Sequence, residues 1–333
     1  MSNTPRGQPG IGELSDLCTP WCIHVAVTLR IAEQLAAGLS EIEEVAAAAG
    51  ADPDALQRLL RHLVSKGIFE EPAPSRFALN EAARALLDPG ARLGLDLDGF
   101  GGRMAHAWSS LLVAVRTGAA AYHTVFGRPF WDDLDAHPEL AARFDDLMGP
   151  AGHGRADPDV LIAREWGSVR HVVDVGGGAG ALLAAVLRDH PTVRGTLVDL
   201  PRTVARAGPI LEAAGVAERV TIVGQSFFDP LPPGADLYLL KSVLSDWPDP
   251  EARAILTRCA EAARRSSGRV SILNGVAPEG ANPSPDVLML VLVGGKQRSL
   301  AEFRELARAA GLEVQAYGTT LSGRFIVECH PIA

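Results

Sequence analysis

The sequence predicts an α/β chain with a doubly wound, mostly parallel sheet in its C-terminal half and a small helical domain before it. The first observation is the run from His171 to Gly180, in which an apolar strand leads into a glycine-rich turn, with a helical pattern following over 181–187. The second is the regular alternation of strands and helices from Trp166 onward. The third is the helical spacing of apolar residues before residue 95.

Composition limits the function classes. The 333 residues are 47% hydrophobic and carry a net charge of -9, which argues against a nucleic-acid partner. No apolar run is long enough to span a bilayer and the start lacks a charged-then-apolar leader, so we expect a cytoplasmic protein without a membrane partner. The four cysteines show no metal-ligand spacing, and we expect reduced, buried thiols and no metal: Cys18, Cys22, Cys259 and Cys329.

The first 95 residues have a winged-helix pattern. Residues 1–11 are polar and predict disorder, and a helical pattern follows over 21–37. A capping box at residues 40–43 predicts a helix that stops at Gly50, and Asp52-Pro53 predicts a third helix over 54–66. The segments 68–69 and 76–79 predict a small hairpin.

A winged helix raises the possibility of DNA binding. The third helix offers basic side chains at Arg58, Arg61, His62 and Lys66, but acids outnumber bases over residues 1–95. The apolar helix at 21–37 instead indicates a surface that is covered by a second subunit. We therefore expect a homodimer, with residues 1–95 as the dimerisation domain.

Residues 96–165 predict a helical linker that contributes to a substrate pocket. Most of the few aromatic residues lie here, together with histidines and methionines. Each residue on its own is more simply explained by core packing, but the set fits an apolar small-molecule pocket. The candidate substrate residues are His106, Trp108, His123, Phe126, Trp131, Met148 and His153, with Met289 from the following domain.

Residues 166–333 predict a seven-stranded sheet with an antiparallel edge. The pattern places strands at 171–175, 195–200, 220–223, 235–240, 269–273, 313–317 and 324–328, and helices at 181–189, 202–213, 249–264 and 299–310. Ligands bind at the carboxyl ends of strands in such sheets, so the motifs at those ends are the candidate site.

The glycine-rich turn favours S-adenosylmethionine over a dinucleotide. Its glycines, Gly176, Gly178 and Gly180, do not match the dinucleotide spacing. A second strand ends about twenty residues later in Asp199, where a carboxylate can accept both ribose hydroxyls. Asp174 places a further acid inside the first motif.

Five motifs in order resemble the plant-caffeate-type O-methyltransferases, and most of all the bacterial relatives that tailor aromatic polyketides and other secondary metabolites. These motifs are the segments 172–180, 198–201, 227–232, 240–249 and 294–299. The resemblance covers nearly the whole chain. It implies a class I methyltransferase fold, Rossmann-like with seven strands, behind a winged-helix dimerisation domain, and S-adenosylmethionine as the cofactor.

The resemblance also assigns cofactor residues. It implies that Gly176 and Gly178 face the methionine part, Asp199 with the neighbouring Leu200 the ribose, and Phe227 the adenine, with Lys241 near the adenine end. An Asp that precedes the aromatic residue in the family is replaced here by Ser226.

The catalytic set of the family is replaced as well. Ser245 stands where the family has its histidine base, and Asn274 and Gln297 stand where the plant enzymes have two glutamates. General-base assistance is worth about 10²–10⁴ in rate, whereas alignment of two reactants can supply about 7–11 kcal/mol. Methyl transfer by proximity and orientation is therefore the favoured function, with Asp246 the nearest titratable group and His106, His123 and His153 as candidate substitutes for the base.

Two other functions stay open. The family includes relatives that bind the cofactor without methyl transfer, so the chain could catalyse hydroxylation, decarboxylation or cyclisation. Arg298 could then hold a substrate carboxylate or enolate, or could form a salt bridge to a neighbouring helix. A non-catalytic regulator built on the winged helix is the third possibility, and the acidic charge balance disfavours it.

Overall fold

The computed structural model describes residues 10–149, 157–162, 166–283 and 285–332 and divides the chain into two compact units, up to Ala105 and from His106 onward. The first break thus falls about ten residues beyond the predicted boundary at 95. The separation of a helical linker, 96–165, from a catalytic domain, 166–333, stays a proposal. Most of the N-terminal tail for which disorder is predicted lies outside the described residues.

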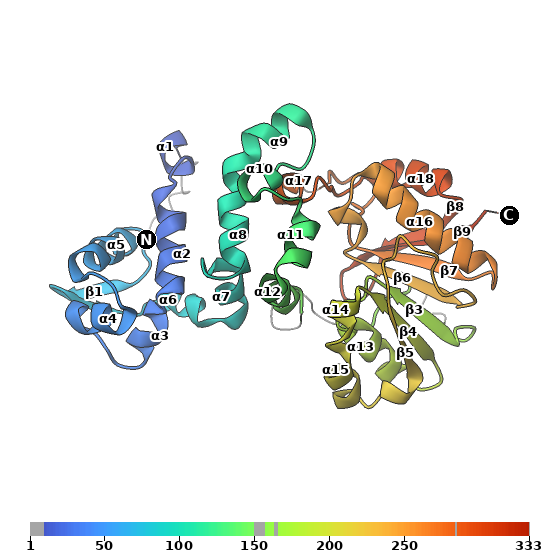
Figure 1. The fold of residues 1–333 in the computed structure, drawn as a ribbon, viewed down its shortest axis with the longest axis horizontal. Coiled ribbons are helices and arrows are strands. Elements are labelled where there is room, and N and C mark those ends of the chain that lie inside the picture. The colour runs from blue at the N-terminus through green and yellow to red at the C-terminus, as the bar shows by residue number, and fades with distance from the viewer. Residues whose placement is uncertain (1–9, 150–156, 163–165, 284, 333) are drawn as a thin grey trace, which may run out of the picture. The chain divides into compact units, whose positions relative to one another are not determined.

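The N-terminal unit has the predicted winged-helix arrangement of helices and a hairpin (Figure 1). Apolar residues of its helices and of the hairpin form one core, which contains Ile31, Leu60 and Phe77. Asp52 accepts a hydrogen bond from the backbone of Ala55 and caps the third predicted helix as expected. The elements are α1 (Ile11–Leu14), α2 (Cys18–Thr28), α3 (Ile31–Ala36), α4 (Ile42–Ala49), α5 (Pro53–Ser65), β1 (Glu70–Ala73), β2 (Arg76–Ala78), α6 (Glu81–Arg84) and α7 (Pro89–Leu95).

Three local predictions in this unit are wrong. The single helix over 21–37 is two helices, because Arg30 adopts a left-handed φ of 57° between α2 and α3. The capping box does not form, because the carbonyl of Ser40 accepts from the backbone of Phe77 and this segment pairs with the hairpin. The first hairpin strand is Glu70–Ala73 rather than residues 68–69.

The C-terminal unit contains the predicted seven-stranded sheet, in the order β5-β4-β3-β6-β7-β9-β8. The first five strands in this order, from β5 to β7, run parallel, and β9 pairs antiparallel with both β7 and β8. The strand bounds are β3 (His171–Val175), β4 (Arg194–Asp199), β5 (Val220–Gly224), β6 (Leu237–Lys241), β7 (Arg269–Leu273), β8 (Leu312–Thr319) and β9 (Phe325–Pro331).

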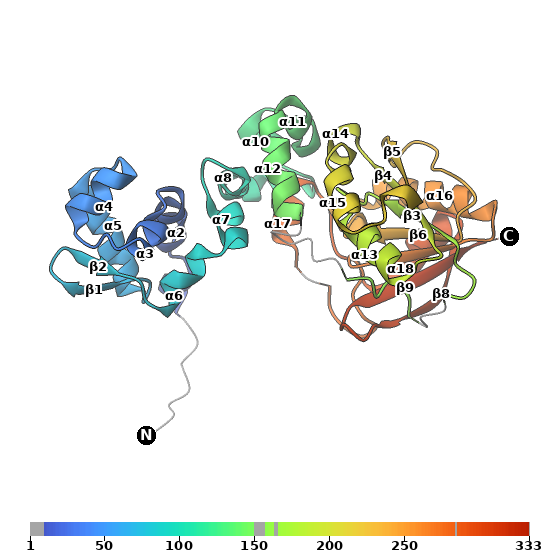
Figure 2. The same ribbon diagram turned by 90° about the horizontal axis from the view of Figure 1, so that it is seen from below.

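Alternate residues of the strands pack against helices on opposite faces of the sheet (Figures 1 and 2). Val173 and Tyr238 pack with helices α16 (Asp249–Arg264) and α18 (Leu300–Ala309). Val172 and Leu237 pack with α13 (Ala181–Asp189), α14 (Pro201–Val204) and α15 (Ala207–Ala213). The single helix predicted over 202–213 is broken because Pro209 has no N–H for the preceding turn.

Short helices precede the sheet, as predicted for this part of the chain. They are α8 (Phe100–Ala107), α9 (Leu111–Thr117), α10 (His123–Phe126), α11 (Phe130–Ala136) and α12 (Pro138–Met148), with a 3-10 turn at Trp108–Ser110. The backbone N–H groups of Ala121 and Tyr122 donate to the carbonyl of Val291 in α17 (Val287–Leu292). These hydrogen bonds fix the segment between α9 and α10 to α17 within the C-terminal unit.

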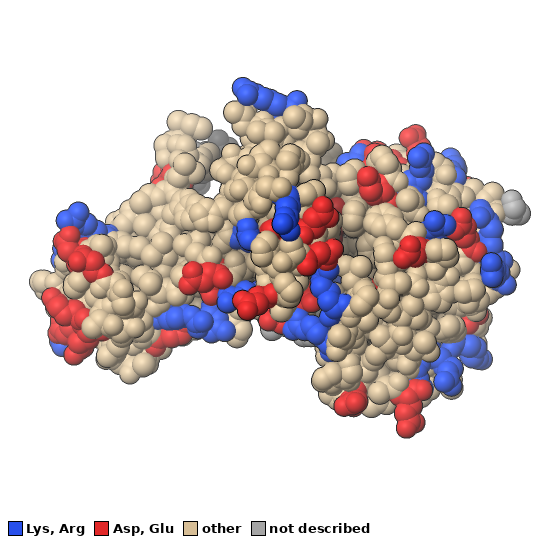
Figure 3. Space-filling view, viewed as in Figure 1, with Lys and Arg blue, Asp and Glu red and all other residues tan. Residues whose placement is uncertain are grey.

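Two surface observations bear on the excluded functions. Acidic and basic side chains are interspersed on the face of the N-terminal unit in Figure 3, where no basic patch is visible. None of the helices within the described ranges has the length and apolar content needed to cross a membrane.

Candidate functional site

The glycine-rich turn after β3 allows a ligand to approach the backbone closely. Gly176, Gly178 and Gly180 all adopt left-handed φ angles, of 69°, 62° and 83°. A Cβ at Gly176 would lie 2.8 Å from the side chain of Val243, whereas a Cβ at Gly178 would meet no atom within 4 Å. The turn is thus packed against the sheet at its first glycine and open at its second.

Asp199 is held at the end of β4, beside this turn. Its Oδ2 accepts from the N–H of Gly178 at 2.8 Å, and its Oδ1 accepts from the N–H of Leu200 at 2.7 Å. Burial raises its pKa, and these backbone donors and Thr203 oppose the shift. A carboxylate has about four acceptor positions, so Asp199 can still accept from a ligand hydroxyl beside these three donors.

Two further residues predicted for the cofactor site, Asp174 and Lys241, lie beside the glycine turn on one face of the sheet. Asp174 is 1% exposed, and a Cβ at Gly177 would lie 2.6 Å from its carboxylate, so it supports the turn from below. Its Oδ2 has no hydrogen-bond partner within the described part of the chain, and burial and Asp199 raise its pKa to about 7. Lys241 follows the strand register to the same face as Asp174, and the two charges attract each other, while its place near the adenine end stays a prediction.

An aromatic wall lies beside the glycine turn. Phe227 is half-buried, and its ring lies 3.4 Å from a Cβ built on Gly176. The ring of Phe227 also meets Trp247 edge to face, with centroids 5.9 Å apart. Ser226, which replaces the acid of the family, accepts from the N–H of Phe228 at 3.2 Å and so stabilises the turn.

The residues at the predicted catalytic positions surround the ends of β6 and β7. The hydroxyl of Ser245 lies 3.5 Å from Oδ1 of Asp246. Burial raises the pKa of Asp246 to about 7, and the negative charge of Asp286, just before α17, adds to the shift. The amide of Asn274 donates to the hydroxyl of Ser242 at 2.8 Å, while Gln297 is half-buried. Asp246 is thus poised between its acid and base forms near neutral pH.

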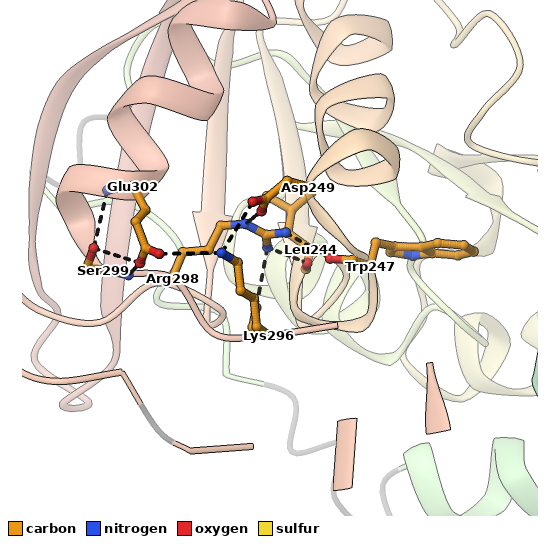
Figure 4. Close-up of polar contacts among 7 residues, drawn as sticks. All are labelled: Leu244, Trp247, Asp249, Lys296, Arg298, Ser299 and Glu302. Carbon is orange, nitrogen blue, oxygen red and sulfur yellow. Dashed lines mark hydrogen bonds and ion pairs between the residues drawn. The ribbon is translucent and has the colours of Figure 1, made fainter. Parts of the chain in front are cut away.

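Arg298 forms the salt bridge that the sequence left as an alternative to substrate binding (Figure 4). Its side chain is 1% exposed and donates at 2.8 Å to Oδ1 of Asp249, at the start of α16. It also donates at 2.8 Å to the carbonyls of Leu244 and Trp247. The guanidinium therefore ties together the loop that carries Ser245 and Asp246, and it is not available to hold a substrate carboxylate.

The backbone packs tightly at this loop. A Cβ at Gly295 would lie 2.0 Å from the carbonyl oxygen of Ser245, so only glycine fits there. The segment that the family motif places at 294–299 thus supports the loop from Ser245 to Trp247 through backbone contact as well as through Arg298.

The candidate substrate residues divide into four groups. Trp131 stacks on Trp247, with ring centroids 5.6 Å apart, and its buried Nε1 has no acceptor among the described residues. Phe126 and Met289 are half-buried. The exposed members are His106, Trp108, His123 and Met148. His153 lies outside the described residues.

Sequence reasoning missed two carboxyl groups near the site. Asp286 adjoins Asp246 electrostatically, as described above. Burial raises the pKa of Asp145 in α12 to about 6, with Asp199 adding to the shift and Arg206 opposing it. An acid in a loop or on a surface helix gives no local signal, because its role depends on a neighbour far away in the sequence.

Comparison with known proteins places these features in a family. The family model described as an O-methyltransferase domain matches residues 108–313, and an O-methyltransferase dimerisation domain matches residues 13–89. A 2,7-dihydroxy-5-methyl-1-naphthoate 7-O-methyltransferase of Streptomyces carzinostaticus is 44% identical over 92% of this chain and 93% of its own length. An aclacinomycin 10-hydroxylase, RdmB, of Streptomyces purpurascens is 38% identical over 92% of this chain and 84% of its own.

A solved structure agrees with the fold. The O-methyltransferase NcsB1 from neocarzinostatin biosynthesis, in complex with S-adenosylmethionine and 2-hydroxy-5-methyl naphthoic acid, superposes with a TM-score of 0.87. It is 42% identical, and the match covers 98% of this chain and 100% of that one. The resemblance and the fold class predicted from the sequence are thereby confirmed. With its methyltransferase and dimerisation domains both matched, the chain belongs to the O-methyltransferase family of enzymes.

Proposed function

We propose that this enzyme transfers a methyl group from S-adenosylmethionine to a hydroxyl of a small aromatic acid of the hydroxynaphthoate type. The substrate class rests on the 44% identity to a naphthoate 7-O-methyltransferase and on the naphthoic acid bound by a 42% identical relative. The observation that carries the reaction is the juxtaposition, at one end of the sheet, of an open glycine turn, Asp199 and Asp246.

The residues present fit the cofactor. The open face at Gly178 leaves room for a ligand that touches backbone, and Asp199 keeps acceptor capacity for a ribose hydroxyl. Phe227 offers a ring beside the turn for an adenine. When bound, S-adenosylmethionine supplies a methyl group that the sulfonium charge already activates.

Asp246 acts as the general base in place of the histidine of the family. In its carboxylate form it accepts the proton of the substrate hydroxyl, and its pKa of about 7 keeps a substantial fraction in that form at neutral pH. Ser245 lies beside it and can hydrogen-bond the same hydroxyl. The amides of Asn274 and Gln297 can form hydrogen bonds but cannot take up a proton near neutral pH. Trp131, whose Nε1 lacks an acceptor among the described residues, supplies a donor for the aromatic acid.

Arg298 has a positioning role. It fixes the carbonyls of Leu244 and Trp247, on either side of Ser245 and Asp246, so that the base is held in one geometry (Figure 4). Orientation of this kind supplies a large part of the barrier reduction when the transferred group is already activated.

One observation favours a second candidate function. A relative at 38% identity is named a hydroxylase, and the three residues of the family's catalytic set are replaced here. The second candidate is therefore a methyltransferase-like enzyme that hydroxylates, decarboxylates or cyclises its substrate instead of methylating it.

Labelled methyl transfer separates the two functions. The purified chain is incubated with S-adenosylmethionine that carries an isotopic methyl label and with a set of hydroxynaphthoic acids, and the products are analysed by mass spectrometry. Methylation gives a labelled product and an equal amount of S-adenosylhomocysteine. With dioxygen and a thiol present as electron donor, a product that gains one oxygen atom, loses carbon dioxide or forms a ring, without S-adenosylhomocysteine, establishes the second function instead.

We further propose that the enzyme is a cytoplasmic homodimer. The match to a dimerisation domain and the exposed apolar residues Leu14, Leu17 and Trp21 support the dimer. The four free thiols support a reducing compartment. Light scattering that gives the mass of one chain at micromolar concentration would contradict the dimer.

A further inference from the structure

A cluster of two cysteines and a histidine lies in the N-terminal unit, away from the site described above. Cys18 and Cys22 are one turn apart on α2, and His62 reaches them from α5. One ligand atom from each residue, the two Sγ atoms and a ring nitrogen, lies within 4.8 Å of the other two. The prediction that all four thiols are buried is wrong, because Cys18 is exposed and Cys22 half-buried. The metal-ligand grouping was missed because its third member, His62, lies on another helix.

The sulfur geometry suits a metal ion better than a disulfide. The Sγ atoms of Cys18 and Cys22 are 3.7 Å apart. Two Zn–S bonds of about 2.3 Å at a tetrahedral angle place two thiolates about 3.8 Å apart. A disulfide needs Cβ atoms about 3.5–4.5 Å apart, whereas residues i and i+4 of a helix hold them at about 5–6 Å.

The histidine is oriented by a chain of hydrogen bonds. Nε2 of His62 lies 2.8 Å from the hydroxyl of Thr19, which donates in turn to the carboxylate of Asp16. Asp16 is itself fixed by the N–H of Cys18 at 2.8 Å and by Lys66 at 3.2 Å. Metal-binding histidines usually have such a link to a carboxylate, which sets the ring orientation.

We propose that Cys18, Cys22 and His62 bind a zinc ion that links α2 to α5. Two thiolates balance the charge of Zn²⁺, and a neutral imidazole completes three protein ligands, which leaves a fourth position for water. The tetrahedral complex needs the ring nitrogen about 3.5 Å from each sulfur, which small side-chain rotations from the present separations provide. The site does not depend on the proposed methyl transfer.

Cobalt substitution tests the site directly. The untagged full chain is stripped with a chelator, kept reduced and titrated with Co²⁺. We expect one equivalent per chain to produce thiolate-to-cobalt charge-transfer bands and the strong d–d bands of tetrahedral cobalt, and Zn²⁺ to abolish them. Absence of these bands at excess Co²⁺ overturns the proposal.

Matched variants assign the signal to residues. Cys18→Ser alters an exposed side chain, so it leaves the fold intact, and we expect it to weaken metal binding more than about 100-fold. Thr19→Val removes only the orienting hydrogen bond and should cost about 10–100-fold. Cys329→Ala changes a buried thiol elsewhere and should leave the bands unchanged. Bands that persist in Cys18→Ser overturn the assignment.

Alkylation supplies a second measurement that needs no variant. Zn²⁺ should protect Cys18 and Cys22 from iodoacetamide, as mapped by peptide mass spectrometry, and a chelator should restore their reactivity. Equal alkylation of both cysteines with and without Zn²⁺ also overturns the proposal.

Discussion

The two halves of the ligand-binding edge differ in how closely they follow the family pattern. The half at β3 and β4 keeps the glycine turn and Asp199, with the carboxylate fixed by two backbone N–H groups. The half at β6 and β7 has lost the histidine and both glutamates, yet its loop is held by Arg298 and by close packing at Gly295. The half at β3 and β4 thus keeps the residues that the family uses for the cofactor. The half at β6 and β7 keeps the loop structure but not the catalytic side chains of the family.

This difference shows that geometry and chemistry can be separated within one site. The loop from Leu244 to Asp249 is held through the backbone carbonyls of Leu244 and Trp247. These contacts do not depend on which side chain stands at position 245. The acid-base function can therefore move to a neighbouring residue without a change of scaffold. A buried carboxyl with a raised pKa, as at Asp246, is the kind of group that can accept it.

The largest effect is expected at the base. Asp246→Asn should lower kcat by about 10²–10⁴-fold, because the amide cannot accept the proton, while the affinity for S-adenosylhomocysteine stays unchanged. Steady-state kinetics and calorimetric titration measure the two quantities separately. Ser245→Ala is the matched control and should have the smaller effect on kcat. An undiminished kcat in Asp246→Asn would show that orientation alone carries the reaction.

The next effect belongs to the other half of the edge. Asp199→Asn should weaken S-adenosylhomocysteine binding by roughly 100-fold or more, since hydrogen bonds to a charged group contribute about 1.5–3 kcal/mol each. Calorimetric titration gives the Kd. Asp189→Asn, which changes an exposed acid at the end of α13, should bind normally. Equal affinities for the two variants would remove Asp199 from the cofactor site.

The scaffold itself can be tested with two cations that share one carboxylate. Arg298→Met should lower the free energy of unfolding by about 2–3 kcal/mol, because the carbonyls of Leu244 and Trp247 lose their buried donors. Lys296 lies 3.3 Å from the same Asp249 but is 45% exposed, so Lys296→Met should cost less than about 1 kcal/mol. Urea unfolding followed by tryptophan fluorescence compares the two. Similar free energies of unfolding for both variants would contradict a stabilising role for Arg298 in this loop.

Features that depend on local sequence patterns were predicted correctly. Strand positions follow from apolar runs and turns, so the five parallel strands and the antiparallel pair were predicted to within a few residues. Local motifs at strand ends also located the glycine turn and Asp199. Helix breaks were missed where one residue decides, as at Arg30 and Pro209.

Contacts between distant segments could not be predicted from single motifs. The sequence left Arg298 between a substrate role and a salt bridge, because burial depends on how the loop packs on α16. The place of Lys241 near the adenine stays a prediction, because its motif does not state which face of the sheet the side chain joins. His62 was considered only as a DNA-binding residue, since its partners Cys18 and Cys22 lie some forty residues earlier.

The smallest effect concerns the electrostatics around the base. Burial and the charge of Asp286 both raise the pKa of Asp246, so kcat should rise with pH through about 7 and level off above it. Asp286→Asn removes the neighbouring charge and therefore lowers this pKa, which moves the rising limb to lower pH. At pH 6 a larger fraction of Asp246 is in the base form in the variant than in the unmodified enzyme. The ratio of kcat at pH 6 to the plateau kcat should therefore be higher in the variant, by less than about tenfold. A pH–rate profile of Asp286→Asn that overlays that of the unmodified enzyme would show that Asp246 does not cause the rising limb. The titrating group would then be the acceptor hydroxyl itself or one of the histidines of the helical segment.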